Sequence, residues 1–139
     1  MPFRPRVVTD GYRMKKFTVI CLAILAACCH SCTPKDGDWD PIRLSKSEIS
    51  FGTEGGTCTV EAKNYKSWWI NDIRVTGTNT YYFPEPGDNR KVAGEGISAM
   101  IGTEENTVVI TVSPSPDRHD WTVEMEAGDA FTSIRIRQN

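Results

Sequence analysis

Apolar and polar residues alternate along several short runs of this chain. In the run 48–52, Ile49 and Phe51 share one parity, and small residues take the other. A period of two with one polar face is typical of a β-strand that is buried on one side only. The same pattern predicts further strands at 57–63, 107–113, 120–127 and 131–137.

A pair of glycines separates the first two runs. Gly55 and Gly56 tolerate positive φ, so the chain can change direction there. The two strands either form a hairpin or lie in opposite sheets with the glycines at the corner. Cys58 has the inward parity of its strand and is expected to be a small buried residue with a free thiol. A disulfide to an upstream cysteine is the alternative.

The run 67–75, SWWINDIRV, predicts a central strand whose parity changes part-way. Trp68 falls on one face and Trp69 on the other. Either both faces are covered, or a bulge near Asn71 and Asp72 resets the register. Weaker strands are expected at 42–44, 78–83 and 97–101.

The segment 84–96, PEPGDNRKVAGEG, predicts a loop because it combines prolines, glycines and mixed charge. Its Asp88, Asn89, Arg90 and Lys91 are candidate contacts for a polar ligand, and a plain connector is the alternative. No helical periodicity is present. The sequence therefore predicts an all-β, immunoglobulin-like β-sandwich of about seven or eight short antiparallel strands.

The N-terminal part of the chain has the pattern of a secretory leader. Lys15 and Lys16 precede an apolar run, FTVICLAILAA, that is too short to span a membrane. Residues 14–27 are therefore expected to be a signal peptide with Met14 as the initiator. Residues 1–13 carry no pattern and are interpreted as an upstream start.

The leader ends in Leu25-Ala26-Ala27-Cys28, which resembles the lipobox of bacterial lipoproteins. The resemblance implies that Cys28 is acylated and becomes the new N-terminus. Cys32 is the alternative, since a small Ser31 precedes it. An ordinary secretory signal with incidental cysteines is a further alternative.

The residues 28–41 that follow are expected to form an acidic tether. Lys35 with Asp36, Asp38 and Asp40 resembles the tag that directs lipoproteins of the Bacteroidetes to the outer face of the outer membrane. A calcium loop is a rival interpretation of the spaced aspartates. That loop also needs a glycine and a glutamate where this chain has proline and serine, so no metal is expected.

Charge and motif content argue against several function classes. The formal net charge is −2, and removing residues 1–27 takes away five basic and one acidic side chain. The remaining acidic module has no basic stripe, so nucleic acid is not an expected partner. The motifs HExxH and Gly-x-Ser-x-Gly are missing from the sequence, CxxC is missing from residues 42–139, and the acidic residues there fit solvated strand faces. No catalytic residue and no cofactor are predicted.

The run LSKSEISFGTEGGTCTVEAKN, the following SWWI and the ending RIRQN together resemble the BACON family of Bacteroidetes-associated domains. The matching features are Leu44-Ser45, Phe51, Gly55-Gly56, a tryptophan at the start of the third strand, and Gln138. The resemblance covers both ends of residues 42–139 and weakens at roughly 77–106. It implies an immunoglobulin-like sandwich that binds carbohydrate.

Four aromatic residues are the candidate ligand-binding site: Trp68, Trp69, Tyr81 and Tyr82. Exposed aromatic rings stack on the apolar faces of sugars. Because adjacent strand residues point to opposite faces, one of the two tryptophans is expected in the core, while Trp39 and Trp121 are expected to serve packing. The predicted function is a non-catalytic binding or adhesion module, lipid-anchored at the outer membrane and exposed on the cell surface, with glycan as ligand. The alternative is an accessory subunit that binds another outer-membrane protein.

Overall fold

The computed structural model describes residues 39–139, which form a compact unit of their own. The predictions for the leader, for acylation at Cys28 or Cys32, and for residues 28–38 of the tether lie outside the described residues. The described part of the chain contains no helix that is long and apolar enough to cross a membrane.

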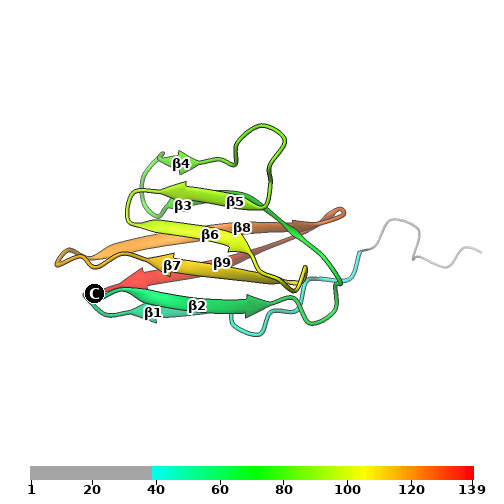
Figure 1. The fold of residues 1–139 in the computed structure, drawn as a ribbon, viewed down its shortest axis with the longest axis horizontal. Helices are drawn as coiled ribbons and strands as arrows, with labels where there is room; N and C mark the ends of the chain where they lie inside the picture. The colour runs from blue at the N-terminus through cyan, green and yellow to red at the C-terminus, as the bar shows by residue number, and fades with distance from the viewer. Residues whose placement is uncertain (1–38) are drawn as a thin grey trace, which may run out of the picture. The chain divides into compact units, whose positions relative to one another are not determined.

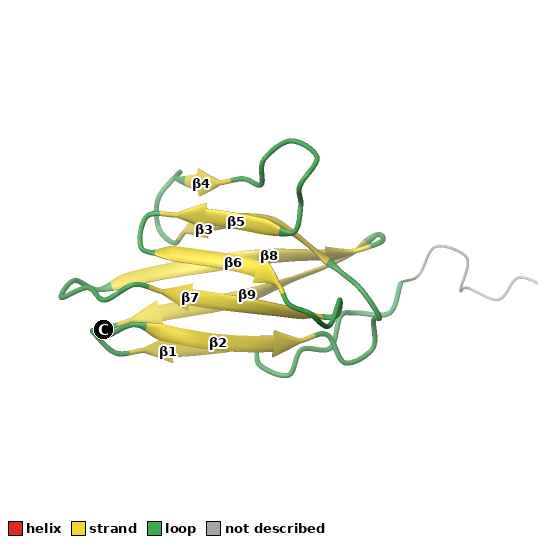
Figure 2. Ribbon diagram, viewed as in Figure 1, coloured by secondary structure: helices red, strands yellow, loops and turns green. Residues whose placement is uncertain are grey.

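Two β-sheets packed face to face make up the described unit (Figures 1 and 2). One sheet has five strands in the order β1-β9-β8-β3-β4, and the other has four in the order β2-β7-β6-β5. The predicted all-β sandwich is therefore confirmed. The strands are β1 (Glu48–Phe51), β2 (Gly56–Glu61), β3 (Trp69–Val75), β4 (Tyr81–Tyr82), β5 (Lys91–Gly94), β6 (Ile97–Ile101), β7 (Thr107–Val112), β8 (His119–Ala127) and β9 (Ala130–Gln138).

The strand pairs are antiparallel except at one edge of the five-stranded sheet. There β1 pairs in parallel with the last strand, β9, with Ile49 opposite Ile136. The expectation of an antiparallel sandwich is wrong for this pair. Its cause is the first turn, which sends β2 into the other sheet instead of folding it back on β1.

Glycine is required at that turn. Gly55 has φ of 69°, and a Cβ built there would lie 2.2 Å from the carbonyl oxygen of Val112 in β7. The backbone therefore passes against the facing sheet too closely for any side chain. Of the two arrangements that the sequence allowed, the corner between sheets is the correct one.

The inward-facing residues of both sheets form one hydrophobic core. The alternation predicted in β7, β8 and β9 is confirmed, because the apolar residue of each alternating pair is buried. The core residues include Val108, Ile110, Val112, Trp121, Val123, Met125, Ile134 and Ile136. Trp121 thus has the packing role that the sequence suggested, whereas Trp39 is half exposed.

The parity change in β3 arises from a bulge. The register with β8 shifts between Ile70 and Asp72, which confirms the predicted irregularity at Asn71 and Asp72. The extra residue keeps both Ile70 and Ile73 in the core although they are three positions apart.

The segment predicted as a loop at 84–96 contains a strand that local sequence rules miss. Lys91–Gly94 forms β5, which pairs with β6 and buries Val92. The prediction failed because one inward apolar residue between charges and glycines is too weak a pattern. Conversely, the expected strand at 42–44 is reduced to a single bridge between Leu44 and Ala62.

Cys58 is half-buried and not fully enclosed, which corrects the expectation for this residue. It lies on β2, an edge strand, and its Sγ is 3.6 Å from the Nζ of Lys46. The side chain faces inward as predicted. At the edge of a sheet, however, an inward-facing side chain is not necessarily fully buried. The structure has Cys58 as a free thiol.

Candidate functional site

Trp68 is a core residue and offers no platform to a ligand. Its side chain is only 3% exposed and packs with the central apolar cluster. Its indole Nε1 is buried without a hydrogen-bond partner. The prediction that one of the two adjacent tryptophans is core is confirmed, and Trp68 is removed as a candidate for glycan stacking.

Trp69 points the other way, onto the outer face of the five-stranded sheet, where it is half-buried. On that face it lies opposite Glu126 of β8, which in turn is opposite Phe131 of β9. Tyr81 pairs much further along β3, opposite Arg74. The two positions are on the order of 13 Å apart along the strand. The structure therefore does not bring Trp69 and Tyr81 together.

The two tyrosines of β4 have different environments. The ring of Tyr82 lies directly on Gly94 of β5, where a Cβ would approach its Cδ2 to 2.2 Å. Tyr82 thus packs against the core cluster and links the open edges of the two sheets. It is a structural residue, and only Tyr81 presents its ring to solvent.

The exposed aromatic pair is Tyr81 with Phe83. The side chains are 43% and 66% exposed, and the rings are stacked with centroids 6.0 Å apart and planes 12° apart. Phe83 was not among the predicted site residues. The signal that points to it is parity, because Tyr81 and Phe83 are two positions apart on an extended segment and therefore share a face.

A hollow of about 280 Å³ opens beside Phe83. Its rim carries both charge signs, with the carboxylates of Glu85 and Asp88 and the ammonium of Lys91, and β5 supplies an apolar floor through Val92 and Ala93. The sequence suggested Asp88 and Lys91 as polar contacts, and both line this hollow.

The free edge of β5 adds backbone groups to the same place. The N–H of Ile101 in β6 donates to the carbonyl oxygen of Arg90 at 2.8 Å, so Arg90 directs its backbone toward β6. In an antiparallel ladder the alternate residues direct theirs away from the partner strand. Lys91 and Ala93 therefore present N–H and C=O groups at the open edge.

The loop above the hollow is held in place by several contacts. Arg90 donates two hydrogen bonds to the carboxylate of Glu105, at 2.7 and 3.1 Å. This bidentate bond holds the pKa of Glu105 below its usual value. In addition, Asp88 Oδ1 accepts from the N–H of Arg90, and the carbonyl of Asn89 accepts from the N–H of Ile70. Asn89 and Arg90, for which the sequence left a ligand contact and a plain connector open, are used to fix the loop.

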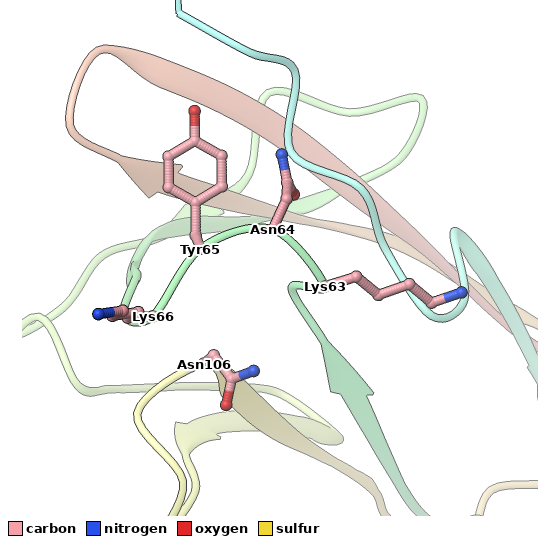
Figure 3. A pocket seen from close by; sticks show the side chains of 5 residues that line it. All are labelled: Lys63, Asn64, Tyr65, Lys66 and Asn106. Carbon is pink, nitrogen blue, oxygen red and sulfur yellow. The ribbon is translucent and has the colours of Figure 1, made fainter.

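Another hollow, of about 430 Å³, lies at the loop after β2 (Figure 3). Its side chains are engaged within the protein. Asn64 donates to the carbonyl of Pro41 and accepts from the N–H of Arg43, and Asn106 donates to the carbonyl of Ala62. Lys63 and Lys66 point in opposite directions (Figure 3), so no charge converges there.

Two neighbouring carboxylates have pKa values above their usual range. Asp72 and Glu124 lie opposite each other on β3 and β8. Burial raises the pKa of Asp72, although nearby Arg74 opposes it, and burial together with the Asp72 charge raises the pKa of Glu124. The pair lies on the outer sheet face, so it does not flank a cleft as two glycosidase carboxylates would.

The single histidine of residues 39–139 has a structural environment. His119 Nε2 is 3.0 Å from the hydroxyl of Ser115, and the ring stacks on Trp121 at 5.1 Å. Within the same part of the chain, no three histidine, cysteine or acidic side chains gather as metal ligands would.

Fold and exposed residues together define a small immunoglobulin-like β-sandwich with an aromatic patch at one sheet edge. No protein-family model matches the chain, and no curated protein matches it. The chain is similar to a solved structure described as the NMR structure of the protein from Bacteroides thetaiotaomicron. The two share 27% identity with a TM-score of 0.59, over 76% of this chain and 92% of the other. This similarity agrees with the sandwich fold.

Proposed function

We propose that this protein is a cell-surface lipoprotein whose β-sandwich is a non-catalytic glycan-binding module. Cys28, or alternatively Cys32, carries the lipid, residues 28–41 form the tether, and the outer membrane holds the anchor. The leader and lipobox pattern support the anchor, and the similarity to a Bacteroides structure agrees with the Bacteroidetes character of the tether.

The observation that carries the glycan proposal is the stacked Tyr81–Phe83 pair beside a polar hollow. A sugar ring has an apolar face of C–H groups and an equatorial rim of hydroxyls. The aromatic pair suits the face, while Glu85, Asp88 and Lys91 suit the hydroxyls as acceptors and donor. The resemblance to the BACON family supports the same ligand class.

The geometry also suits binding without reaction. The polar groups of the hollow lie at an open sheet edge, from which water is not excluded. Because the Arg90–Glu105 bond fixes the loop before a ligand arrives, little ordering entropy is lost on binding. A pre-formed, open platform is typical of modules that recognise exposed chains of sugars.

The test is a glycan array with soluble residues 39–139 and three matched variants. Tyr81→Ala and Phe83→Ala are expected to lower binding by about ten-fold each, because each removes one stacking ring. Phe131→Ala, a similarly exposed phenylalanine on another strand, is the control and is expected to bind like the wild type. Binding that persists in both variants, or no binding to any glycan by the folded protein, refutes the proposal.

A second function is favoured by the outer face of the four-stranded sheet. The register places uncharged residues side by side on three strands, and Met100 is about half exposed among them. Charged residues lie only at the border of this face. The uncharged residues are Thr57, Thr59, Ser98, Met100, Val109 and Thr111.

Such a face suits a protein partner in the outer membrane. A crosslinker attached at Met100→Cys on intact cells is then expected to capture one defined membrane protein. The same linker at Ser133→Cys, an exposed position on the other sheet, should not capture it. A chain that is silent on the glycan array and captures a partner through position 100 is an accessory subunit.

A further inference from the structure

The described part of the chain begins at one end of the sandwich. It comprises Trp39, the loop 63–66 after β2 and the β8–β9 turn at Gly128 and Asp129 (Figures 1 and 2). We call it the tether end, because residues 28–38 lead into it. The ring of Trp39 lies over Gly128, with ring atoms 3.5 to 3.8 Å from where a Cβ would be.

Two large aromatic side chains are exposed at the tether end. Trp39 is 52% exposed, and Phe131, near the start of β9, is 60% exposed. Packing within the domain does not explain why these two rings are exposed. Neither ring lines any of the hollows described above. Phe131 stands at the position where β9 leaves the turn, across Glu126 from the half-buried Trp69.

The position of Trp39 is fixed by the contacts around the loop 63–66. The Tyr65 hydroxyl donates to the carbonyl of Asp40, Asn64 donates to that of Pro41 at 2.9 Å, and the N–H of Lys63 donates to that of Arg43 at 2.7 Å. These bonds clamp the first described residues onto the sandwich. The hollow of about 430 Å³ lies beside these contacts.

We propose that the tether end docks on the bilayer surface, with Trp39 and Phe131 inserted at the level of the lipid headgroups. This inference rests on the proposed lipid anchor. Eleven peptide steps separate Cys28 from Trp39, so the anchor keeps the tether end within about 40 Å of the bilayer even at full extension. The tether end would then remain close enough to the bilayer for a weak surface contact to be occupied most of the time.

Exposed tryptophan and phenylalanine rings suit the interface zone, where one part of the side chain is wet and the other is not. The contact does not depend on anionic lipid, because the charges of Glu126 and Asp129 near Phe131 balance those of Lys63 and Lys66 in the loop 63–66. The expected partner is therefore a zwitterionic lipid surface, bound through apolar insertion.

Docking at this end would leave the Tyr81 ring of the proposed glycan site free. Trp69 begins β3 at the tether end, whereas Tyr81 pairs with Arg74 near the other end of that strand. Tyr81 is thus held on the order of 13 Å further from the bilayer along the strand direction. The segment after Tyr81 runs back toward the tether end, where the carbonyl of Asn89 accepts from the N–H of Ile70. The contact would also restrict rotation of the module about its tether.

The test is flotation of soluble residues 39–139 with phosphatidylcholine vesicles. This part of the chain contains the whole core, and the similar Bacteroides protein has a chain of nearly the same extent. Trp39→Ala and Phe131→Ala are each expected to lower vesicle partitioning by about ten-fold. Phe83→Ala is the matched control with an equally exposed phenylalanine, and circular dichroism verifies that each variant is folded.

Equal partitioning of the wild type and the Trp39→Ala/Phe131→Ala double variant overturns the proposal. No flotation of the wild type at about millimolar lipid, the effective concentration that a short tether would impose, also overturns it. Binding that needs anionic lipid and disappears in high salt also overturns it, because the contact would then be electrostatic. The anchor is judged separately, by the mass of the N-terminal peptide of the membrane-extracted protein. Failure to find lipid on Cys28 or Cys32 therefore cannot be confused with failure to float.

Discussion

Gln138 is the residue whose substitution should most clearly test how the two sheets are joined. It is fully buried at the end of β9. Its Nε2 donates to the carbonyl of Gly52, which follows β1, at 3.2 Å, and to the carbonyl of Ser113, which follows β7, at 2.9 Å. A single amide thus connects the end of the five-stranded sheet to the end of the four-stranded sheet.

The change Gln138→Leu keeps the volume and removes both bonds. The Gly52 oxygen keeps a bond from the N–H of Gly55 at 3.1 Å, whereas the Ser113 oxygen loses the only partner it has among the described residues. Each lost bond is worth about 1 kcal/mol, and the unpaired Ser113 acceptor, whose bond is only partly buried, costs about 1 kcal/mol more. Part of this loss is offset, because the buried Oε1 of Gln138 has no partner in the native protein.

The expected loss is therefore about 2–3 kcal/mol in the free energy of unfolding, measured by urea titration with the slope m unchanged. For a domain of this size it corresponds to a fall in Tm of about 10–20 °C. Arg135→Gln, an exposed change on the same strand, is the control and should stay within about 0.5 kcal/mol of the wild type. A Gln138→Leu protein as stable as that control would refute the proposed link between the sheets.

Two further changes test packing and charge. Gly94→Ala places a methyl group on the ring of Tyr82 and should destabilise the domain by about 1–3 kcal/mol in urea unfolding. Adding Tyr82→Ala removes the clash, so the loss of stability in the double variant should be smaller than the sum of the two single losses. Asp72 and Glu124 have folded pKa values above their unfolded ones, so their ionisation opposes folding at neutral pH and this penalty disappears as the pH falls through the raised values. Asp72→Asn should therefore raise stability at pH 7, with a gain that shrinks toward pH 4; a gain that is constant with pH would contradict the assigned cause.

The alternation of residues was sufficient to predict most strands, because a sandwich buries one face of each strand. The strongest runs, such as those of β7 and β9, are the ones with three or more inward apolar residues. The strand β5 escaped prediction because its only inward apolar residue is Val92, between charged and glycine positions. Its existence depends on pairing with β6, which no local pattern contains.

The candidate site was predictable only in part, for a related reason. Parity separates Trp68 from Trp69 but does not say which of them faces the core, because that depends on the sheet that covers them. Likewise, nothing local distinguishes Tyr81 from Tyr82; the distinction comes from Gly94 on another strand, whose missing side chain makes room for one ring. Phe83 follows from Tyr81 once that face is known.

The two proposed surfaces can be separated because each contains one exposed phenylalanine of similar accessibility. Phe83 belongs to the glycan patch and Phe131 to the tether end, so each is the control for the other. Loss of glycan binding in the Phe83→Ala variant together with loss of flotation in the Phe131→Ala variant would assign two independent contacts. If both variants lost both activities, a general change in the fold would be the explanation, and neither surface would be established. The pair of reciprocal results is therefore stronger than either assay alone, since no single loss of stability produces it.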